Sequence, residues 1–362
     1  MTEPTQASSP LAVHGGNILA TAEALGCKVS DLIDLSSNLT PFGTMPGLQE
    51  ALIAGLDEIR YLPESGSESL CALFAEKNRI SRNAVLAGNG TTEFIYAVPA
   101  AFGCQRAVIV NPTYADYATA CQWAGVPAES FILDPASGFR LDPAALAERL
   151  IGGELVFLCN PNNPTGVLTP SAELAALARS KPETLFLVDE SYLPFTREPS
   201  LLTLGQPENL LVLFSASKIY AIPGLHLGFL AGSAARIAKL GQRVKPWGVN
   251  RLAQLAGEYA LRHGDSYQEE VIRFVDTERP RVVARLAALP GVAPFAGAAN
   301  FILSRLTGAV RAPELKAALL RERIMIRDCS NFAALDDRYF RISLKDQTIN
   351  DHALSKIGAF FG

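Results

Sequence analysis

The sequence has few of the residues that hold metal ions, and those few are not spaced as ligands. None of the six cysteines belongs to a CxxC pair, and all lie in apolar stretches, which is typical of small buried side chains. The four histidines show no spacing typical of a metal site. We therefore expect no metal in this protein.

Long hydrophobic segments and an excess of one charge are missing too. The 362 residues contain no run of about 18 uncharged apolar residues, and the N-terminus lacks a basic start followed by an apolar core. Lys and Arg number 32 against 36 Asp and Glu, so the formal net charge is −4 and no basic field favours a nucleic acid. These absences predict a cytoplasmic protein with neither a membrane nor a nucleic-acid partner. An anionic small substrate would need only a few placed cations.

Hydrophobic residues make up 49% of the chain, enough for a large core. Short apolar runs alternate with amphipathic helical stretches such as residues 142–151 and 171–180. This alternation predicts an α/β fold in which helices cover a mostly parallel sheet. The runs cover residues 84–87, 106–110, 154–159, 184–188, 210–214 and 228–231.

The two ends of the chain follow other patterns. Residues 1–45 are rich in Gly, Pro, Ser and Asn and predict an arm with one short helix around residues 16–25. After residue 250 a long helical segment over 250–285 precedes a mixture of strands and helices, with one strand expected over 324–327. We expect an arm over 1–45 that packs with a small domain, a large domain over 46–250 and the small domain over 251–362.

Polar residues come directly after the apolar runs, at the sheet edge where α/β proteins bind ligands. The glycine-bearing turn from Gly88 to Glu93 leads into a helical stretch, whose free N–H groups suit a phosphate. Tyr114 follows the second run and NPNNPTG, residues 160–166, the third. Two structural interpretations stay open: the Gly88–Glu93 turn as a plain connection and Tyr114 as a packed loop tyrosine.

Asp189 and Lys218 follow two further runs. An aspartate at such a place is more often a helix cap, and a lysine more often a solvated surface charge. Lys218, however, comes immediately after a fully apolar run and beside two serines, which favours an enclosed setting. Together, the phosphate-binding turn, aromatic ring, amide, carboxylate and lysine predict a pyridoxal 5′-phosphate site, in which the lysine bonds to the cofactor and the carboxylate keeps the pyridine nitrogen protonated.

The strings NPNNPTG, DESY and SASK with the following PG and G resemble the fold-type I pyridoxal-phosphate enzymes of the aminotransferase class I/II superfamily, over nearly the whole chain from about residue 12. Within it the chain is similar to the histidinol-phosphate aminotransferase branch. The strings HGGN (14–17), PWGVN (246–250), IRDC (326–329) and LDDRYFR (335–341) are most similar to the threonine-phosphate decarboxylases. The resemblance implies a large mostly parallel-sheet domain with a smaller α+β domain.

The resemblance also implies roles in cofactor binding. Lys218 becomes the Schiff-base lysine and Asp189 the partner of the pyridine nitrogen. Asn163 and Tyr192 contact the 3-oxygen of the ring, on which Tyr114 stacks. The residues that line the cofactor phosphate are Gly90, Thr91, Ser215 and Ser217. Tyr61 matches a tyrosine that reaches this phosphate from the partner subunit, which implies a homodimer with shared sites.

For the substrate, the resemblance assigns Arg341 to the carboxylate and places Asn38 near it. His14, Asn17 and Arg327 are candidates for a substrate phosphate.

His226 departs from the family pattern, which has an arginine there to grip the cofactor phosphate. An imidazole offers one donor instead of a bidentate, permanently charged clamp. Loss of one charge-assisted hydrogen bond costs about 1.5–3 kcal/mol. Either His226 binds the phosphate as a cation or another group compensates.

The expected reaction is decarboxylation of L-threonine O-3-phosphate to (R)-1-amino-2-propanol O-phosphate in cobalamin biosynthesis, with Lys218 handling the proton. The bond perpendicular to the cofactor ring breaks, and no motif states which bond that is. An aminotransferase using histidinol phosphate and 2-oxoglutarate therefore stays open, as does a phosphoserine-using variant. A non-catalytic binding protein would predict loss of Lys218 or Asp189, and both are present.

Overall fold

The computed structural model describes residues 16–205 and 207–361. Its largest sheet has seven strands in the order β2-β8-β7-β6-β5-β3-β4. The last five run parallel, and β8 is antiparallel to both its neighbours. The strands are β2 (Val85–Asn89), β3 (Arg106–Asn111), β4 (Ala128–Ile132), β5 (Glu154–Cys159), β6 (Leu185–Asp189), β7 (Leu210–Ser215) and β8 (Leu227–Gly232). The predicted mostly parallel sheet is confirmed.

Each of the six predicted apolar runs forms one of these strands. All residues of β5 and β6 are buried, so both faces of the sheet are covered there, as in other parallel sheets. The sequence does not predict β4, because this strand lies at the sheet edge, is largely exposed and has no apolar run.

Helices that connect and flank these strands follow the expected amphipathic pattern. In α7 the buried face consists of Leu174, Ala175, Leu177 and Ala178, spaced for one side of a helix. The helices of this part are α2 (Leu48–Ala54), α3 (Glu68–Asn78), α4 (Gly90–Phe102), α5 (Asp116–Trp123), α6 (Pro143–Arg149), α7 (Ser171–Ser180), α8 (Ala216–Ile219), α9 (Ala234–Gly241) and α10 (Arg251–His263).

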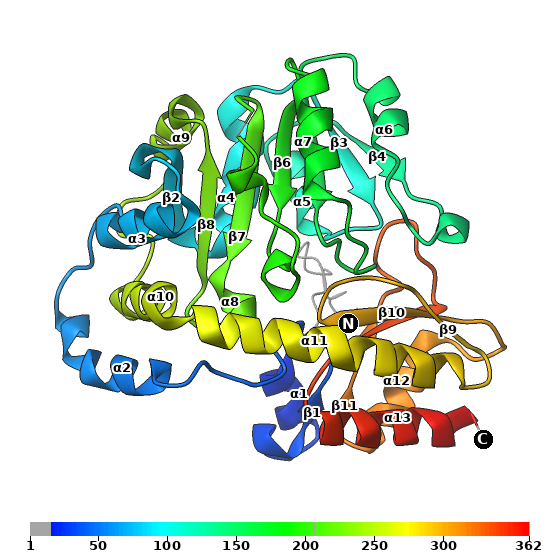
Figure 1. Ribbon diagram of the computed structural model, residues 1–362. Coiled ribbons are helices and arrows are strands. Elements are labelled where there is room, and N and C mark those ends of the chain that lie inside the picture. The colour runs from blue at the N-terminus through cyan, green and yellow to red at the C-terminus, as the bar shows by residue number, and fades with distance from the viewer. Residues whose placement is uncertain (1–15, 206, 362) are drawn as a thin grey trace, which may run out of the picture.

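A four-stranded antiparallel sheet in the order β12-β13-β10-β9 forms the second part of the molecule. In Figure 1, α11 runs below the large sheet, and α12 and α13 lie below α11. The elements of this second part are α11 (Asp265–Ala287), β9 (Val292–Pro294), β10 (Phe301–Leu306), α12 (Ala312–Arg321), β12 (Arg327–Asp328), β13 (Tyr339–Ser343) and α13 (Gln347–Phe361).

The N-terminal segment joins this second part. β1 (Ile33–Asp34) pairs in parallel with β11 (Ile324–Met325), and the Ser343 amide donates to the Leu35 carbonyl over 2.9 Å. α1 (Ile18–Ala24) lies beside them, with Ala22 packed in a small cluster with Met325. The three domain boundaries drawn from the sequence stay a prediction.

Two expected elements differ in the structure. The helical segment over 250–285 is two helices, α10 and α11, which meet at Gly264. A Cβ at Gly264 would lie 2.4 Å from the Ala260 carbonyl oxygen and 2.8 Å from the Tyr220 ring, so the chain turns there on a residue without a side chain. The strand expected over 324–327 is divided, because β11 pairs with β1 whereas β12 pairs with β13.

One continuous hydrophobic core includes buried side chains from the seven-stranded and the four-stranded sheet, from Phe186 and Phe229 to Phe301 and Phe340. Within the described residues, no helix is both long and apolar enough to span a membrane.

Candidate active site

Two adjoining cavities lie at the carboxyl ends of the parallel strands, where an α/β sheet binds ligands. The inner cavity has a volume of about 150 Å³ and the outer one about 470 Å³. Residues that line both are Tyr114, Asn163, Tyr192, Lys218 and Pro223. These shared walls make the two cavities one site with a deep part and a wide entrance.

Asp189 lies in the deep part, at the end of β6. Its carboxylate accepts hydrogen bonds from the Tyr117 hydroxyl and the Ser191 amide, each over 2.9 Å. Burial raises the pKa of Asp189, while the bonds from Ser191 and Tyr117 act against that rise. A buried carboxylate held by donors at fixed positions can stabilise a nearby positive charge.

Lys218 faces the same space from α8, the short helix after β7. Burial lowers the pKa of its ammonium, the positive charge of Arg341 lowers it further, and Asp189 opposes both. Its carbonyl oxygen accepts from the Thr40 amide over 3.1 Å, which ties this turn to the N-terminal segment. A lowered pKa increases the fraction of lysine present as the neutral amine, which is the form that attacks a carbonyl carbon.

A cradle for an anion forms where β2 leads into α4. Gly90 adopts a φ of +73°, and Gly228 on β8 packs so closely that a Cβ there would lie 2.5 Å from the Thr91 amide nitrogen. Thr91, Ser215 and Ser217 line the cavity beside this turn. The turn leads into the N-terminus of α4, a helix of 13 residues. Free N–H groups and the helix dipole make such a turn a phosphate site.

His226 belongs to this cradle. Its Nδ1 lies 3.2 Å from the position that a Cβ on Gly90 would occupy, and the residue lines the inner cavity. Its backbone φ of +52° is unusual for a residue with a side chain. The imidazole therefore stands where the sequence places a phosphate contact.

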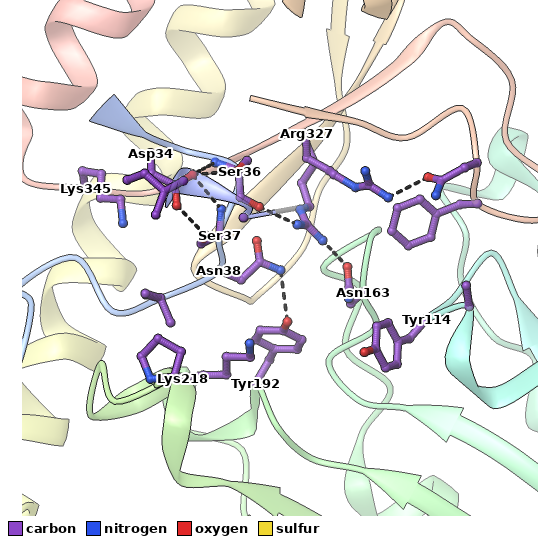
Figure 2. A pocket seen from close by; sticks show the side chains of 18 residues that line it. Asp34, Ser36, Ser37, Asn38, Tyr114, Asn163, Tyr192, Lys218, Arg327 and Lys345 are labelled. Carbon is purple, nitrogen blue, oxygen red and sulfur yellow. Dashed lines mark hydrogen bonds between the residues drawn. The ribbon is translucent and has the colours of Figure 1, made fainter. Parts of the chain in front are cut away.

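The outer cavity joins segments that are far apart in the chain. Arg341 on β13 donates to the Asn163 side-chain oxygen, and to the Ser36 carbonyl over 3.0 Å. Asn38 donates to the Tyr192 hydroxyl over 3.1 Å, and in Figure 2 it lies directly above Tyr192. The predicted substrate contacts thus lie against the predicted cofactor contacts.

Phe301 supports two of these groups. Its ring lies 5.1 Å from the Arg341 guanidinium carbon and 4.9 Å, edge on, from the Tyr192 ring. Two buried polar atoms at the outer cavity, Asn38 Oδ1 and Arg341 Nε, have no hydrogen-bond partner among the described residues. Buried polar atoms in this state are expected where a ligand completes the site.

A family model for aminotransferase class I and II matches residues 30–357. The chain belongs to that family. It is 35% identical over 349 residues to the threonine-phosphate decarboxylase of Salmonella typhimurium, a match that covers 95% of each protein.

Solved structures of two related enzymes share the fold. The L-threonine-O-3-phosphate decarboxylase of Porphyromonas gingivalis has a TM-score of 0.83 and 29% identity, over 91% of this chain and 99% of that one. The histidinol-phosphate aminotransferase of Clostridium acetobutylicum has a TM-score of 0.85 and 26% identity over the same shares. The expected fold-type I architecture is confirmed.

The inner cavity of this class I and II family member fits pyridoxal 5′-phosphate. Its lining contains the anion cradle around Gly90, the Asp189 carboxylate and Lys218, which also lines the outer cavity. Tyr114 forms part of the wall, its ring 5.7 Å from that of Tyr117 and nearly perpendicular to it. Burial raises the pKa of Tyr192 to about 12, so its hydroxyl keeps its proton at neutral pH.

Three predicted residues lie outside these cavities or outside the described residues. Asn17 is exposed and caps α1, its side chain accepting from the Ala20 amide over 3.3 Å, although its neighbours Gly16 and Ile18 line the outer cavity. Tyr61 is 65% exposed and lines neither cavity. His14 falls outside the described residues. Their assigned roles stay predictions.

Arg327 lines the outer cavity, and its role as a substrate contact stays a prediction. Its guanidinium donates to the Asn331 side chain over 2.6 Å and lies 5.3 Å from the Phe332 ring centre.

Sequence reasoning missed several residues of the site. Tyr117 could have been found, because it lies only three residues after Tyr114, in the first turn of α5. Asp34 ends a strand of only two residues, too short to show as an apolar run, and Ser36 and Ser37 follow that strand. Lys345 lies past β13 and gives no local signal at all.

Proposed function

We propose that this protein is a pyridoxal-phosphate-dependent decarboxylase that converts L-threonine O-3-phosphate into (R)-1-amino-2-propanol O-phosphate and CO₂, in the biosynthesis of cobalamin. The observation that carries the proposal is the outer cavity, where Arg341, Asn38 and Arg327 face the Lys218 side of the cofactor site. Two cationic groups at separate points suit a substrate with two anionic groups. The two decarboxylases reported above support the choice of reaction.

The cofactor of this enzyme is pyridoxal 5′-phosphate, which when bound supplies an electron sink for the bond that breaks at the substrate Cα. Asp189, fixed by Tyr117 and Ser191, stabilises positive charge at the pyridine nitrogen. Tyr192 and Asn163 hold the 3-oxygen, and the Gly90 turn with His226 holds the phosphate.

Lys218 has two tasks in the proposed reaction. Burial lowers the pKa of its ammonium, which favours the neutral amine that would hold the cofactor. After the Cα–carboxylate bond breaks and CO₂ leaves, the Lys218 ammonium delivers the proton that takes its place on Cα. Arg341 and Asn38 would hold the substrate carboxylate, and this placement would select the Cα–carboxylate bond over Cα–H.

An aminotransferase acting on histidinol phosphate with 2-oxoglutarate is the second candidate. It is supported by the structural similarity to the Clostridium acetobutylicum enzyme, and the same cofactor residues would serve it. Phosphoserine as substrate is a variant of the first candidate, since one methyl group changes affinity by only about 1–3 kcal/mol.

The deciding experiment is product analysis by mass spectrometry after the loaded enzyme is mixed with L-threonine O-3-phosphate in the absence of a keto acid. We expect catalytic formation of aminopropanol phosphate by the wild type and a loss of roughly 10³-fold or more for Lys218→Ala. No such product, but turnover of histidinol phosphate once 2-oxoglutarate is added, would establish the aminotransferase instead.

A homodimer with shared sites is part of the proposal. Tyr61 belongs to an exposed apolar group on α2 and the turn that follows, in which Ile53, Ile59 and Leu62 are 66%, 63% and 78% exposed. Such a group is typical of a surface covered by another protein chain. The cytoplasmic location stays a prediction from the sequence.

A further inference from the structure

A short segment between β1 and α2, residues 36–43, crosses the candidate site, and we call it the crossing segment. Near its start, Arg341 on β13 donates to the Ser36 carbonyl over 3.0 Å. Further along, the Thr40 amide donates to the Lys218 carbonyl over 3.1 Å. The crossing segment therefore connects the four-stranded sheet to the turn that carries the cofactor lysine.

That turn depends on support from outside itself. Its helix, α8, has only four residues, and helices this short are not stable alone. The Lys218 carbonyl is among the last four of the helix, which have no partner within it. The Thr40 amide supplies a partner. The position of Lys218 is therefore tied to the position of the crossing segment.

Two buried hydroxyl groups fix the crossing segment on α11. The Thr40 hydroxyl lies 3.1 Å from the Tyr267 hydroxyl, which lies 2.6 Å from the Gly43 carbonyl oxygen. A carbonyl only accepts, so Tyr267 donates its single proton to Gly43, and Thr40 donates to Tyr267. Burial raises the pKa of Tyr267, so its hydroxyl keeps this proton at neutral pH. The pair thus forms one chain of hydrogen bonds that closes on the segment it holds.

Neighbouring packing supports the same arrangement. The Phe42 ring lies 4.9 Å from that of Phe274, edge on, and Phe274 follows Tyr267 by seven residues on one face of α11. The turn after α8 packs on the start of α11, because a Cβ on Gly264 would lie 2.8 Å from the Tyr220 ring. In Figure 1, α8 lies directly above the start of α11. The lysine turn, the crossing segment and α11 meet in one place.

From these contacts we infer that Thr40 and Tyr267 are positioning residues, whose hydroxyl pair holds Lys218 in place for its reaction with the cofactor. Neither residue lines the inner or the outer cavity, so both act through the crossing segment. Asn38, two residues before Thr40, is held by the same segment. The inference rests on the part of the proposed function in which Lys218 binds the cofactor, and it holds for either candidate reaction.

The test compares Thr40→Val and Tyr267→Phe, which each remove one hydroxyl and keep the shape of the side chain, in the enzyme loaded with pyridoxal 5′-phosphate. The first readout is the absorbance of the cofactor against pH, which follows the proton on the nitrogen that joins it to Lys218 and needs no substrate. Burial and Arg341 lower the pKa of Lys218 and outweigh Asp189, so a looser turn should raise it. We expect the midpoint to rise by roughly half to one pH unit in both variants.

The second readout is kcat with L-threonine O-3-phosphate, which should fall roughly 3- to 30-fold in both variants. The double variant should resemble either single one, because the two hydroxyls belong to one chain of hydrogen bonds. Thr40→Ser keeps the hydroxyl and should restore the wild-type values. Tyr259→Phe is the matched control: the Tyr259 hydroxyl donates to the Pro46 carbonyl over 3.3 Å and lines neither cavity.

Unchanged midpoints in both variants, effects that add in the double variant, no rescue by Thr40→Ser or an equal shift in the control would each overturn the inference. A wild type whose Lys218 forms no bond to the cofactor would overturn it together with that part of the proposed function. A wild type that forms the bond but releases no CO₂ would refute the decarboxylase alone, since the absorbance titration still decides the inference. Thermal melting verifies that each variant is folded, and if Thr40→Val unfolds, Tyr267→Phe decides.

Discussion

The inner cavity is formed by the ends of neighbouring strands, whereas the outer cavity is assembled from segments far apart in the chain. Asp189, Ser215 and the Gly90 turn each directly end or follow a strand of one sheet. Ser36, Arg327 and Arg341 come from two other sheets and their connections. The two cavities, built from different parts of the chain, also differ in how their polar groups are hydrogen-bonded.

In the inner cavity the Asp189 carboxylate has two protein donors, the Tyr117 hydroxyl and the Ser191 amide. At the outer cavity, Asn38 Oδ1 and Arg341 Nε have no hydrogen-bond partner within the described residues, and the Lys345 ammonium has none either. The inner site is organised before a ligand arrives, while the outer one is completed by the ligand. Substitutions in the two cavities should therefore affect different steps.

The largest effect is expected from Asp189→Asn, which removes the charge at the deep end of the inner cavity. We expect kcat to fall roughly 10²- to 10³-fold with little change in substrate affinity, because the lost interaction acts on developing charge. Steady-state kinetics at saturating cofactor measure this. Glu190→Gln is the matched control: Glu190 is an adjacent buried carboxylate that bonds to Ser200 and Leu201 and lines neither cavity. A similar fall in the control would show that any buried carboxylate at the end of β6 matters.

Arg341→Gln should mainly weaken substrate binding, whereas Asp189→Asn should mainly lower kcat. Its guanidinium is the expected carboxylate contact of the outer cavity, and we expect the KM for L-threonine O-3-phosphate to rise roughly 10- to 100-fold. Cofactor content, read from the absorbance of the purified protein, should stay at the wild-type level. If the variant loses its cofactor, the two cavities do not act separately and the comparison is wrong.

The smallest effect is expected from Tyr117→Phe, which removes one donor to Asp189 and keeps the ring stacked 5.0 Å from that of Phe157. Burial already raises the pKa of Asp189, and the Tyr117 hydroxyl holds it down, so the variant raises that pKa further. Asp189 works as the anion, present above its pKa, so the acid limb of the kcat profile should move to higher pH.

At neutral pH the loss of kcat in Tyr117→Phe should be only roughly two- to tenfold. A pH–rate profile measured beside that of the wild type gives both quantities. A limb that does not move, or that moves to lower pH, would contradict the role given to this hydrogen bond.

Much of the fold could be predicted from local patterns, because a strand buried on both faces must be apolar along its whole length. β5 and β6 show this, and so does α7 through its helical spacing. The edge strand β4 and the two-residue β1 escaped prediction, since neither forms an apolar run. The break between α10 and α11 at Gly264 was missed for another reason. Any side chain at this position is excluded by Tyr220, 44 residues earlier in the chain.

By itself the sequence determined the inner cavity, since Asp189, Asn163 and Lys218 stand at or just past strand ends, and parallel strands bring those ends to one edge. Only the tertiary structure decided the outer cavity. There Arg341 meets Asn163, 178 residues away, and Lys345 lies beside Asp34. No local pattern encodes such meetings, because they depend on how β1, β11 and β13 pack against one another after each has formed.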